Sequence, residues 1–269
     1  MAKKQLAILG GGFMGSAIAA GLIESGWRRE DLIVAEVREA RREFLTQQLQ
    51  LETTEDSPAA IASAEVVLIA VKPQAIEPAL MEVAAGHQND QLLLSVCAGI
   101  TTTTIEARVE GAHVIRAMPN TAAAIGTSAT AIARGTYASD SDLATAINIL
   151  SAVGKVVVVD EAQIDAVTAV SGTGPAYVFF LAEALIEAAQ REGLSREQAH
   201  VLTYQTLLGS ARLLSHDTAG PAELRARVTS PGGTTDAAIR HLESAGWQEV
   251  FIEAVGQARK RAGELGRNE

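Results

Sequence analysis

The first fifteen residues hold the feature that most constrains the fold, an apolar run that ends in glycines and continues into a helix-forming segment. Residues 6–9 have the apolar character of a buried strand, and Gly10, Gly12 and Gly15 have the spacing G-x-G-x-x-G. Such glycines permit a tight turn, close approach of backbone N–H groups to a pyrophosphate, and close helix–strand packing. A helix beginning near Phe13 would present its N-terminus to the anion. The stretch predicts a Rossmann-type dinucleotide turn, and a plain strand–turn–helix with glycines needed only for packing is the alternative.

Composition places the chain among folded, acidic proteins. Its 269 residues are 48% hydrophobic, and its formal net charge of -10 argues against a general nucleic-acid or anionic-membrane partner. Cys97 is the single cysteine, which excludes a disulfide framework within the chain and a thiolate metal cluster, and fits a reducing cytoplasm. We find no export signal and no apolar stretch of the roughly 20 residues that a membrane span requires. We therefore expect a cytoplasmic protein with no nucleic-acid or membrane partner.

The second predicted strand, residues 32–37, carries the groups that bear on the choice of dinucleotide. A carboxylate at Glu36 would accept hydrogen bonds from the adenosine ribose and repel a 2′-phosphate, which favours NAD. Arg38, Arg41 and Arg42 could instead hold that phosphate, although Arg41 and Arg42 fit the solvated face of the next helix slightly better. The choice between NADH and NADPH stays open at this point.

Three more predicted strands, residues 66–71, 92–96 and 113–116, also end in residues suited to a ligand crevice. Ligands of parallel sheets bind at the carboxyl ends of the strands, and small residues there let a nicotinamide lie across the backbone. A surface lysine in a loop is the alternative for Lys72. The residues after these strands that we expect at the crevice are Lys72, Pro73, Ala98, Gly99 and Asn120.

Residues 127–133 and 155–159 are also strand-like, with a helical pattern at 143–150 between them. Strands and helices thus alternate up to residue 160, which predicts a doubly wound, parallel-rich α/β sheet. Ser57 is expected to cap one helix, and Thr103 with Glu106 fits a capping box of another. From Asp160 onward helix-period segments replace the alternation, so we predict a dinucleotide-binding domain at 1–160 and an all-helical domain at 161–269. Helix breaks are expected at 171–175, 193–195, 220–221, 231–233 and 246.

A second constellation lies in the helical part, at residues 229–235. Two glycines, two threonines and a following helix N-terminus make a site suited to a carboxylate or phosphate, while a flexible, capped helix connection is the alternative. Residues 171–175 form a similar interruption, for which a cavity wall and close helix packing are evenly balanced. No metal-ligand spacing, P-loop or nucleophile elbow is present, and hydride transfer needs orientation more than a reactive side chain.

These features together resemble the pyrroline-5-carboxylate reductase family over nearly the whole chain. The segments that carry the resemblance are Pro221–Glu243, Ala169–Tyr177, Ala70–Gln74 and Arg116–Thr121. The resemblance implies reduction of 1-pyrroline-5-carboxylate to L-proline with NADPH, or NADH, as donor. It also implies homodimers built from the helical domains and further assembly into rings.

The resemblance also implies roles for individual residues. Ser230, Gly233, Thr234 and Thr235 would receive the substrate carboxylate, and Thr235 is our candidate catalytic residue, orienting the substrate. The residues implied at the cofactor are Gly10, Gly12, Phe13, Met14, Gly15, Ser57, Val71, Lys72, Pro73, Ala98, Gly99 and Asn120. Phe13, Ser57 and Ala122 depart from the residues usual in the family, which bears on cofactor contacts rather than on the reaction.

Two other interpretations remain open from sequence. A related imine reductase or hydroxyacid dehydrogenase would share the two-domain build but lack the segment 228–235. A non-catalytic dinucleotide-binding sensor would bind cofactor without turnover. The presence of segment 228–235 argues against the first alternative. An assay of turnover would test the second.

Overall fold

The computed structural model describes residues 3–266, which fall into two compact units. The first unit contains the chain up to Thr173 together with the segment from Ala258 onward, and the second is Gly174–Gln257. Residues 161–173 thus pack with the sheet-containing unit. The domain boundary between residues 160 and 161 stays a prediction, since compactness alone does not define a domain.

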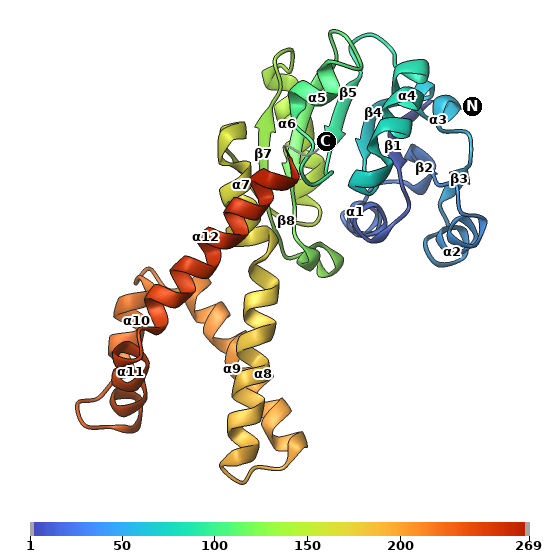
Figure 1. Cartoon of the computed structure of the whole chain (residues 1–269). Coiled ribbons are helices and arrows are strands. Elements are labelled where there is room, and N and C mark those ends of the chain that lie inside the picture. The colour runs from blue at the N-terminus through green and yellow to red at the C-terminus, as the bar shows by residue number, and fades with distance from the viewer. Residues whose placement is uncertain (1–2, 267–269) are drawn as a thin grey trace. The chain divides into compact units, whose positions relative to one another are not determined.

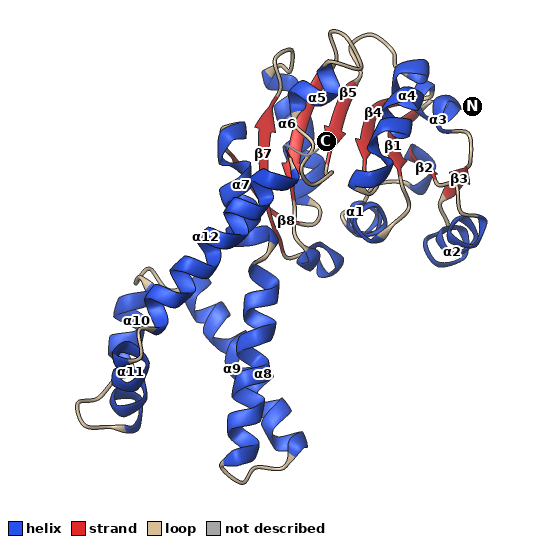
Figure 2. Ribbon diagram, viewed as in Figure 1, coloured by secondary structure: helices blue, strands red, loops and turns tan. Residues whose placement is uncertain are grey.

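The first unit is built on a sheet that, among the described residues, has eight strands in the order β3-β2-β1-β4-β5-β6-β7-β8 (Figure 2). Neighbouring strands are parallel except β6 and β7, which are antiparallel. The strands are β1 Lys4–Leu9, β2 Leu32–Ala35, β3 Glu52–Thr54, β4 Ala64–Ile69, β5 Leu92–Ser95, β6 His113–Met118, β7 Ser128–Arg134 and β8 Gly154–Val158. The predicted doubly wound, parallel-rich sheet is confirmed, and only the short strand β3 was not predicted.

Apolar side chains on both faces of the sheet form the core of this unit. Leu6 and Ile8 of β1 pack into one buried cluster, while Ala7 and Leu9 pack into a second. Burial on both faces explains why β1 is a continuous apolar run instead of an alternating one. The helices of this unit are α1 Phe13–Glu24, α2 Glu39–Leu49, α3 Ser57–Ala62, α4 Ile76–Gly86, α5 Thr102–Glu106, α6 Asp140–Ser151 and α7 Ile164–Val167, labelled in Figure 1.

The cap predicted for α3 is wrong by one residue. The Oδ1 atom of Asp56 accepts the Ala59 N–H at 3.0 Å, so Asp56 is the N-cap and Ser57 is the first residue of the helix. An aspartate and a serine are comparable caps, so the sequence did not decide between neighbours. Ser57 is buried as a result.

The capping box predicted for α5 is also wrong. Thr101 is the N-cap, and its hydroxyl oxygen accepts the Thr104 N–H at 3.1 Å. The Glu106 carboxylate turns away from the helix start and accepts the N–H and O–H of Thr136 at 2.6 and 2.8 Å. A partner 30 residues along the chain therefore replaces the local one.

The second unit is all helical, as predicted. The breaks at 193–195, 220–221, 231–233 and 246 are confirmed, whereas residues 168–172 continue from α7 as a π-helical turn that leads almost directly into α8. The remaining helices are α8 Gly174–Arg191, α9 Arg196–His216, α10 Pro221–Arg227, α11 Thr234–Ser244 and α12 Trp247–Leu265, the last of which ends in the first unit.

The helices of the second unit expose large apolar side chains. Phe180 of α8 is 75% exposed, and Phe179, Val201, Leu202 and Val250 are also exposed. The continuous stretch Glu161–Arg191 is long and apolar enough to cross a membrane by length and composition alone, which the sequence analysis did not predict. Exposed apolar side chains of this size are typical of a surface that another molecule covers.

Candidate functional site

The carboxyl ends of β1, β2 and β4 surround a cavity of about 470 Å³. β1 lies between β2 and β4, so the chain winds away from it in both directions, and ligands of open α/β sheets bind at this point. The cavity brings together Gly10, Gly12, Glu36, Arg38, Ser57, Val71 and Lys72, all from the predicted cofactor set. Its α4 side, formed by Ala75, Pro78, Ala79 and Glu82, carries no motif that sequence reasoning could have recognised.

The glycine turn after β1 fits a dinucleotide pyrophosphate. Gly10 has φ +97°, and a Cβ atom there would lie 2.8 Å from the Ala70 carbonyl oxygen, so only glycine is accommodated. A Cβ on Gly15 would collide with the Gly10 carbonyl oxygen, whereas nothing lies within 4 Å of the corresponding position on Gly12. Gly10 and Gly15 are thus required by the fold itself, while Gly12 leaves open space at the N-terminus of α1.

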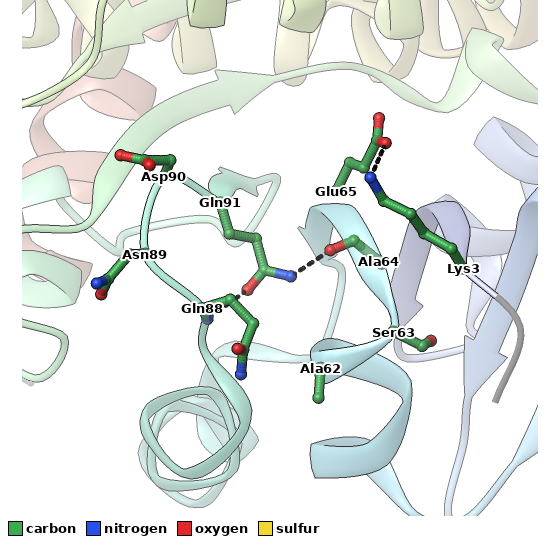
Figure 3. Close-up of a pocket in the computed structure, with 9 residues that line it drawn as sticks. All are labelled: Lys3, Ala62, Ser63, Ala64, Glu65, Gln88, Asn89, Asp90 and Gln91. Atoms are coloured by element: carbon green, nitrogen blue, oxygen red, sulfur yellow. Dashed lines mark hydrogen bonds and ion pairs between the residues drawn. The ribbon is translucent and has the colours of Figure 1, made fainter.

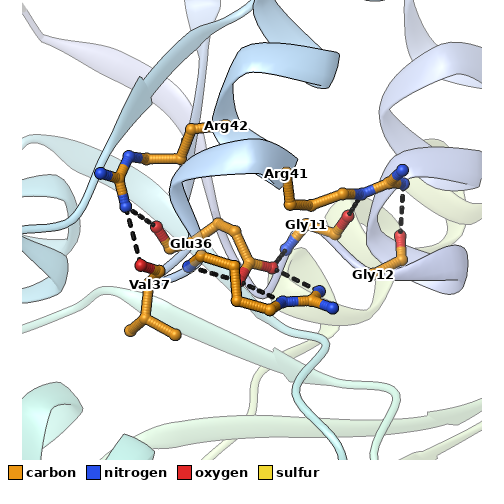
Figure 4. A network of polar contacts seen from close by, with 7 residues as sticks. Gly11, Gly12, Glu36, Val37, Arg41 and Arg42 are labelled. Carbon is orange, nitrogen blue, oxygen red and sulfur yellow. Dashed lines mark hydrogen bonds and ion pairs between the residues drawn. The ribbon is translucent and has the colours of Figure 1, made fainter.

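Glu36 is the centre of a polar network beneath this turn (Figure 4). Its side chain is almost fully buried, and its Oε2 atom accepts the Gly11 N–H at 3.1 Å. The Arg38 guanidinium donates to both carboxylate oxygens, from Nε at 2.9 Å and Nη2 at 3.1 Å, and the Arg38 N–H donates to Oε1 at 3.0 Å. Burial alone raises the pKa of Glu36, but the hydrogen bonds from Arg38 and Gly11 outweigh burial and hold that pKa below its ordinary value. Glu36 is therefore an ionised, fully engaged carboxylate.

Arg41 and Arg42 of α2 are tied to the same loops instead of facing solvent. Arg41 donates from Nε to the Gly11 carbonyl oxygen, and from Nη2 to the Ser16 hydroxyl at 2.9 Å. Arg42 donates from Nη1 to the carbonyl oxygens of Glu36 and Val37, each at 2.9 Å (Figure 4). The interpretation of these two arginines as a solvated helix face is wrong, because unpaired carbonyls at the strand and turn ends recruit them.

Phe13, Met14 and Pro73 are next to residues of this cavity in the chain but are not among the residues that line it. Lys72 precedes a 3₁₀ turn, Pro73–Ala75, that begins with the predicted proline. Phe13 and Met14 open α1, and the Phe13 side chain is exposed. The cofactor roles of Phe13, Met14 and Pro73 stay predictions.

Ala98, Gly99 and Asn120 lie outside the lining of this cavity. Gly99 has φ +82°, and a Cβ there would approach the backbone of Gly266 at 3.7 Å. The Asn120 amide donates from Nδ2 to the Ser171 carbonyl oxygen at 3.1 Å, and its Oδ1 accepts the Ala122 N–H at 3.1 Å. Their predicted contact with the nicotinamide half of a cofactor stays a prediction.

The loop before α11 has the features of an anion site in the second unit. Gly232 has φ +73° and Gly233 is the N-cap, so the predicted residues Ser230, Gly233, Thr234 and Thr235 occupy the loop and the first helical turn. The amides of a first turn have no partner within the helix and attract an anion. The substrate-binding role of this loop stays a prediction.

Asp236, which sequence reasoning missed, organises the same loop. Its Oδ2 accepts the Gly232 N–H at 3.0 Å and its Oδ1 accepts Arg240 Nε at 3.0 Å. The bond from Gly232, more than the Arg240 contact, lowers the pKa of Asp236. The position three residues after the N-cap was the available signal, because a carboxylate there commonly bonds back to the loop. Arg240 offsets a negative charge that would otherwise oppose a bound anion.

A second cavity in the described residues contains none of the predicted site residues. It has a volume of about 590 Å³ and lies at the amino ends of β4 and β5, away from the glycine turn (Figure 3). Several polar side chains there bond within the protein: Lys3 pairs with Glu65 at 2.7 Å, and Gln91 Nε2 donates to the Ala64 carbonyl oxygen at 2.7 Å. Within residues 3–266 no three His, Cys, Asp or Glu side chains group so as to hold a metal ion.

Two protein-family models match separate parts of the chain. A family model described as pyrroline-5-carboxylate reductase dimerisation matches residues 161–265, and one described as NADP oxidoreductase, coenzyme F420-dependent, matches residues 5–99. A pyrroline-5-carboxylate reductase from Synechocystis is 44% identical over 264 residues, with 98% of each chain covered.

Solved structures agree with this match. A pyrroline-5-carboxylate reductase from Coxiella burnetii superimposes with a TM-score of 0.93 at 36% identity, covering 98% of this chain and 99% of the other. A pyrroline carboxylate reductase from Plasmodium falciparum, crystallised with NADP bound, has a TM-score of 0.87 at 26% identity and covers 99% of each chain.

Proposed function

Because the chain belongs to the pyrroline-5-carboxylate reductase family, we propose that it reduces 1-pyrroline-5-carboxylate to L-proline, the last step of proline biosynthesis. NADPH, with NADH as an alternative, is the hydride donor. The observation that carries the proposal is that one chain combines a glycine-turn cavity at the switch point of its sheet with a separate Gly-Gly-Thr-Thr loop at a helix N-terminus. The first feature suits a dinucleotide and the second suits the carboxylate of an imino acid.

The cofactor would be held by the residues around the glycine turn. When bound, it supplies the hydride that the C=N carbon accepts. Gly12 leaves room for a pyrophosphate, and the first-turn amides of α1 face that room with no side-chain cap. The remaining residues that we assign to contact with the cofactor are Gly10, Phe13, Met14, Gly15, Arg38, Ser57, Val71, Lys72, Pro73, Ala98, Gly99 and Asn120. Glu36 lies among them and supports the site through its bonds to Gly11 and Arg38.

The substrate carboxylate would be held by the loop before α11. Ser230 and Thr234 supply hydroxyl donors, Gly233 lets the backbone approach, and Thr235 orients the ring by a hydrogen bond. A protonated imine accepts a hydride more readily than a neutral one. The Thr235 hydroxyl is too weak an acid to be the sole proton donor, so solvent completes the protonation at nitrogen.

The protein would act as a homo-oligomer in the cytoplasm. The exposed apolar side chains of α8, α9 and α12 give the second unit a surface that a second copy would cover, as in homodimers that assemble further into rings. The same requirement accounts for the apolar stretch Glu161–Arg191 without a membrane. The acidic net charge of -10 supports the absence of a nucleic-acid partner.

Mixing the purified protein with NADPH and pyrroline-5-carboxylate tests the proposal. We expect loss of the reduced-nicotinamide absorbance and formation of proline in equal amounts. A panel of other cyclic imines and of 2-keto acids distinguishes a related imine reductase or hydroxyacid dehydrogenase. Cofactor binding without turnover of any of these would instead identify a dinucleotide-binding sensor.

A further inference from the structure

The carboxylate of Glu36 occupies the place where a ribose acceptor is expected, yet its hydrogen-bonding capacity is already used. A carboxylate offers about four lone-pair sites. The Gly11 N–H, the Arg38 N–H and two guanidinium N–H groups of Arg38 approach them at 2.9 to 3.1 Å. To accept ribose hydroxyls, Glu36 would have to give up bonds to the glycine turn or to Arg38.

Arg38, in contrast to Glu36, keeps hydrogen-bonding groups that are open to a ligand. Although it is paired with a buried carboxylate, its side chain is 63% exposed and lines the same cavity as Gly12, Ser57 and Lys72. A guanidinium has five N–H donors, and Glu36 is approached through Nε and Nη2 only. The remaining donors are therefore open to a ligand, and a guanidinium held in one plane is suited to bind a phosphate.

We infer that Arg38 recognises the 2′-phosphate of NADPH, and that Glu36 holds Arg38 and the glycine turn in position instead of accepting ribose hydroxyls, so that the protein prefers NADPH. The inference rests on the dinucleotide-binding part of the proposed function. An unpaired carboxylate beside the ribose would repel a 2′-phosphate, but here Arg38 neutralises that charge. Lys72 adds a second positive charge to the cavity lining.

A similar arginine–carboxylate pair, Arg28 and Asp31, precedes the amino end of β2 and can serve as a control. Arg28 donates from Nε and Nη2 to the two carboxylate oxygens of Asp31 at 3.0 and 2.8 Å. The arginine side chain is 67% exposed and the aspartate side chain 12% exposed, close to the 63% and 5% of Arg38 and Glu36. Arg28 also approaches Glu30 Oε1 at 3.3 Å, so Arg28→Leu removes a similar ion pair and one weaker contact, both away from the cavity.

Dissociation constants for NADPH and NADH, measured by calorimetry without substrate, test the inference. Arg38→Leu should weaken NADPH binding about 10- to 100-fold while NADH binding changes by less than about threefold. Arg28→Leu should leave both constants within about twofold of the wild-type values. Equal weakening of the two dinucleotides by Arg38→Leu, or no weakening of NADPH, would overturn the inference.

Glu36→Gln tests the role given to the carboxylate. The amide oxygen still accepts the Gly11 N–H, so NADH binding should change by less than about threefold. A tenfold or greater loss of NADH binding with NADPH binding unchanged would show that Glu36 is the ribose acceptor and that the inference is wrong. Should Arg38→Leu lower the melting temperature more than Arg28→Leu does, the double variant Glu36→Gln/Arg38→Leu leaves no unpaired carboxylate and should show the same selective loss of NADPH.

Failure of the inference and failure of the proposed function are separable in this design. Wild-type protein that binds NADPH selectively through Arg38 but does not turn over pyrroline-5-carboxylate supports the inference and overturns the proposed function. Wild-type protein that binds neither dinucleotide overturns both.

Discussion

The side-chain amide of Asn120 donates a hydrogen bond of 3.1 Å to the carbonyl oxygen of Ser171, and thereby joins the end of β6 to the π-helical turn at residues 168–172. The same turn packs against the end of the Met118 side chain, which lies 2.8 Å from where a Cβ on Gly172 would be. A π-helical turn changes which carbonyls find partners within the helix. Asn120 supplies the partner for Ser171, so we expect it to stabilise the junction between sheet and helix.

Asn120→Asp isolates this bond. The aspartate keeps the oxygen that accepts the Ala122 N–H but places an acceptor against the Ser171 carbonyl oxygen. We expect the free energy of unfolding, measured in urea, to fall by about 1–3 kcal/mol. Asn148→Asp on the exposed side of α6 is the control and should change stability by less than about 0.5 kcal/mol. Equal effects of the two substitutions would show that the Asn120–Ser171 bond contributes nothing specific.

The glycine turn predicts a separation between folding and cofactor binding. Gly10→Ala forces a side chain into a positive φ and against the Ala70 carbonyl, so it should destabilise the protein by about 2 kcal/mol or more. Gly12→Ala meets no atom within 4 Å and has φ −68°, so stability should change by less than about 1 kcal/mol. NADPH binding to Gly12→Ala should nonetheless weaken about tenfold or more, because a methyl group occupies the approach to the pyrophosphate. Wild-type affinity in Gly12→Ala would remove Gly12 from the site.

Glu36 predicts a pH-dependent contribution to stability. Burial raises its pKa, but hydrogen bonds from Arg38 and Gly11 outweigh burial and leave the pKa below the ordinary value of 4.5. The folded protein therefore binds this proton less readily than the unfolded chain, and the stabilisation is present above pH 4.5 and lost as the pH falls through the depressed pKa. Urea unfolding between about pH 7 and about pH 3 should show wild type losing more stability than Glu36→Gln on the acid side. Parallel pH dependences in the two proteins would contradict this.

The sheet was predictable from sequence because burial on both faces makes each central strand a short apolar run. Leu6 and Ala7 point into different clusters, yet both are apolar. β3 was missed because Glu52 and its two threonine neighbours form a partly exposed edge strand without that pattern.

The site was predictable only where its contacts are local. The glycine spacing identifies the turn, but it does not show that Glu36 bonds to Gly11, 25 residues away, or that Asn120 bonds to Ser171, 51 residues away. Glu36 and Arg38 were correctly placed at one strand end. Their mutual pairing depends on the directions of the two side chains in the loop after β2. A residue pattern does not predict these directions.

Thr235 predicts a loss of catalysis that its conservative replacement should restore. Removing the hydroxyl in Thr235→Ala should lower kcat/KM for pyrroline-5-carboxylate about 10- to 100-fold, while NADPH binding stays within about twofold. Thr235→Ser keeps the hydroxyl and should recover most of the activity. Normal affinity and turnover in Thr235→Ala would remove the assignment of Thr235 as the residue that orients the substrate.

Transfer of deuterium from the reactive face of deuterated NADPH to the product tests the proposed reaction most directly. Mass spectrometry and NMR of the product locate the label. We predict L-proline with a single deuterium on the ring carbon that was double-bonded to nitrogen, formed in proportion to the NADPH oxidised. Oxidation of NADPH with no deuterium in proline, or binding of both ligands with no turnover, would contradict the proposed function.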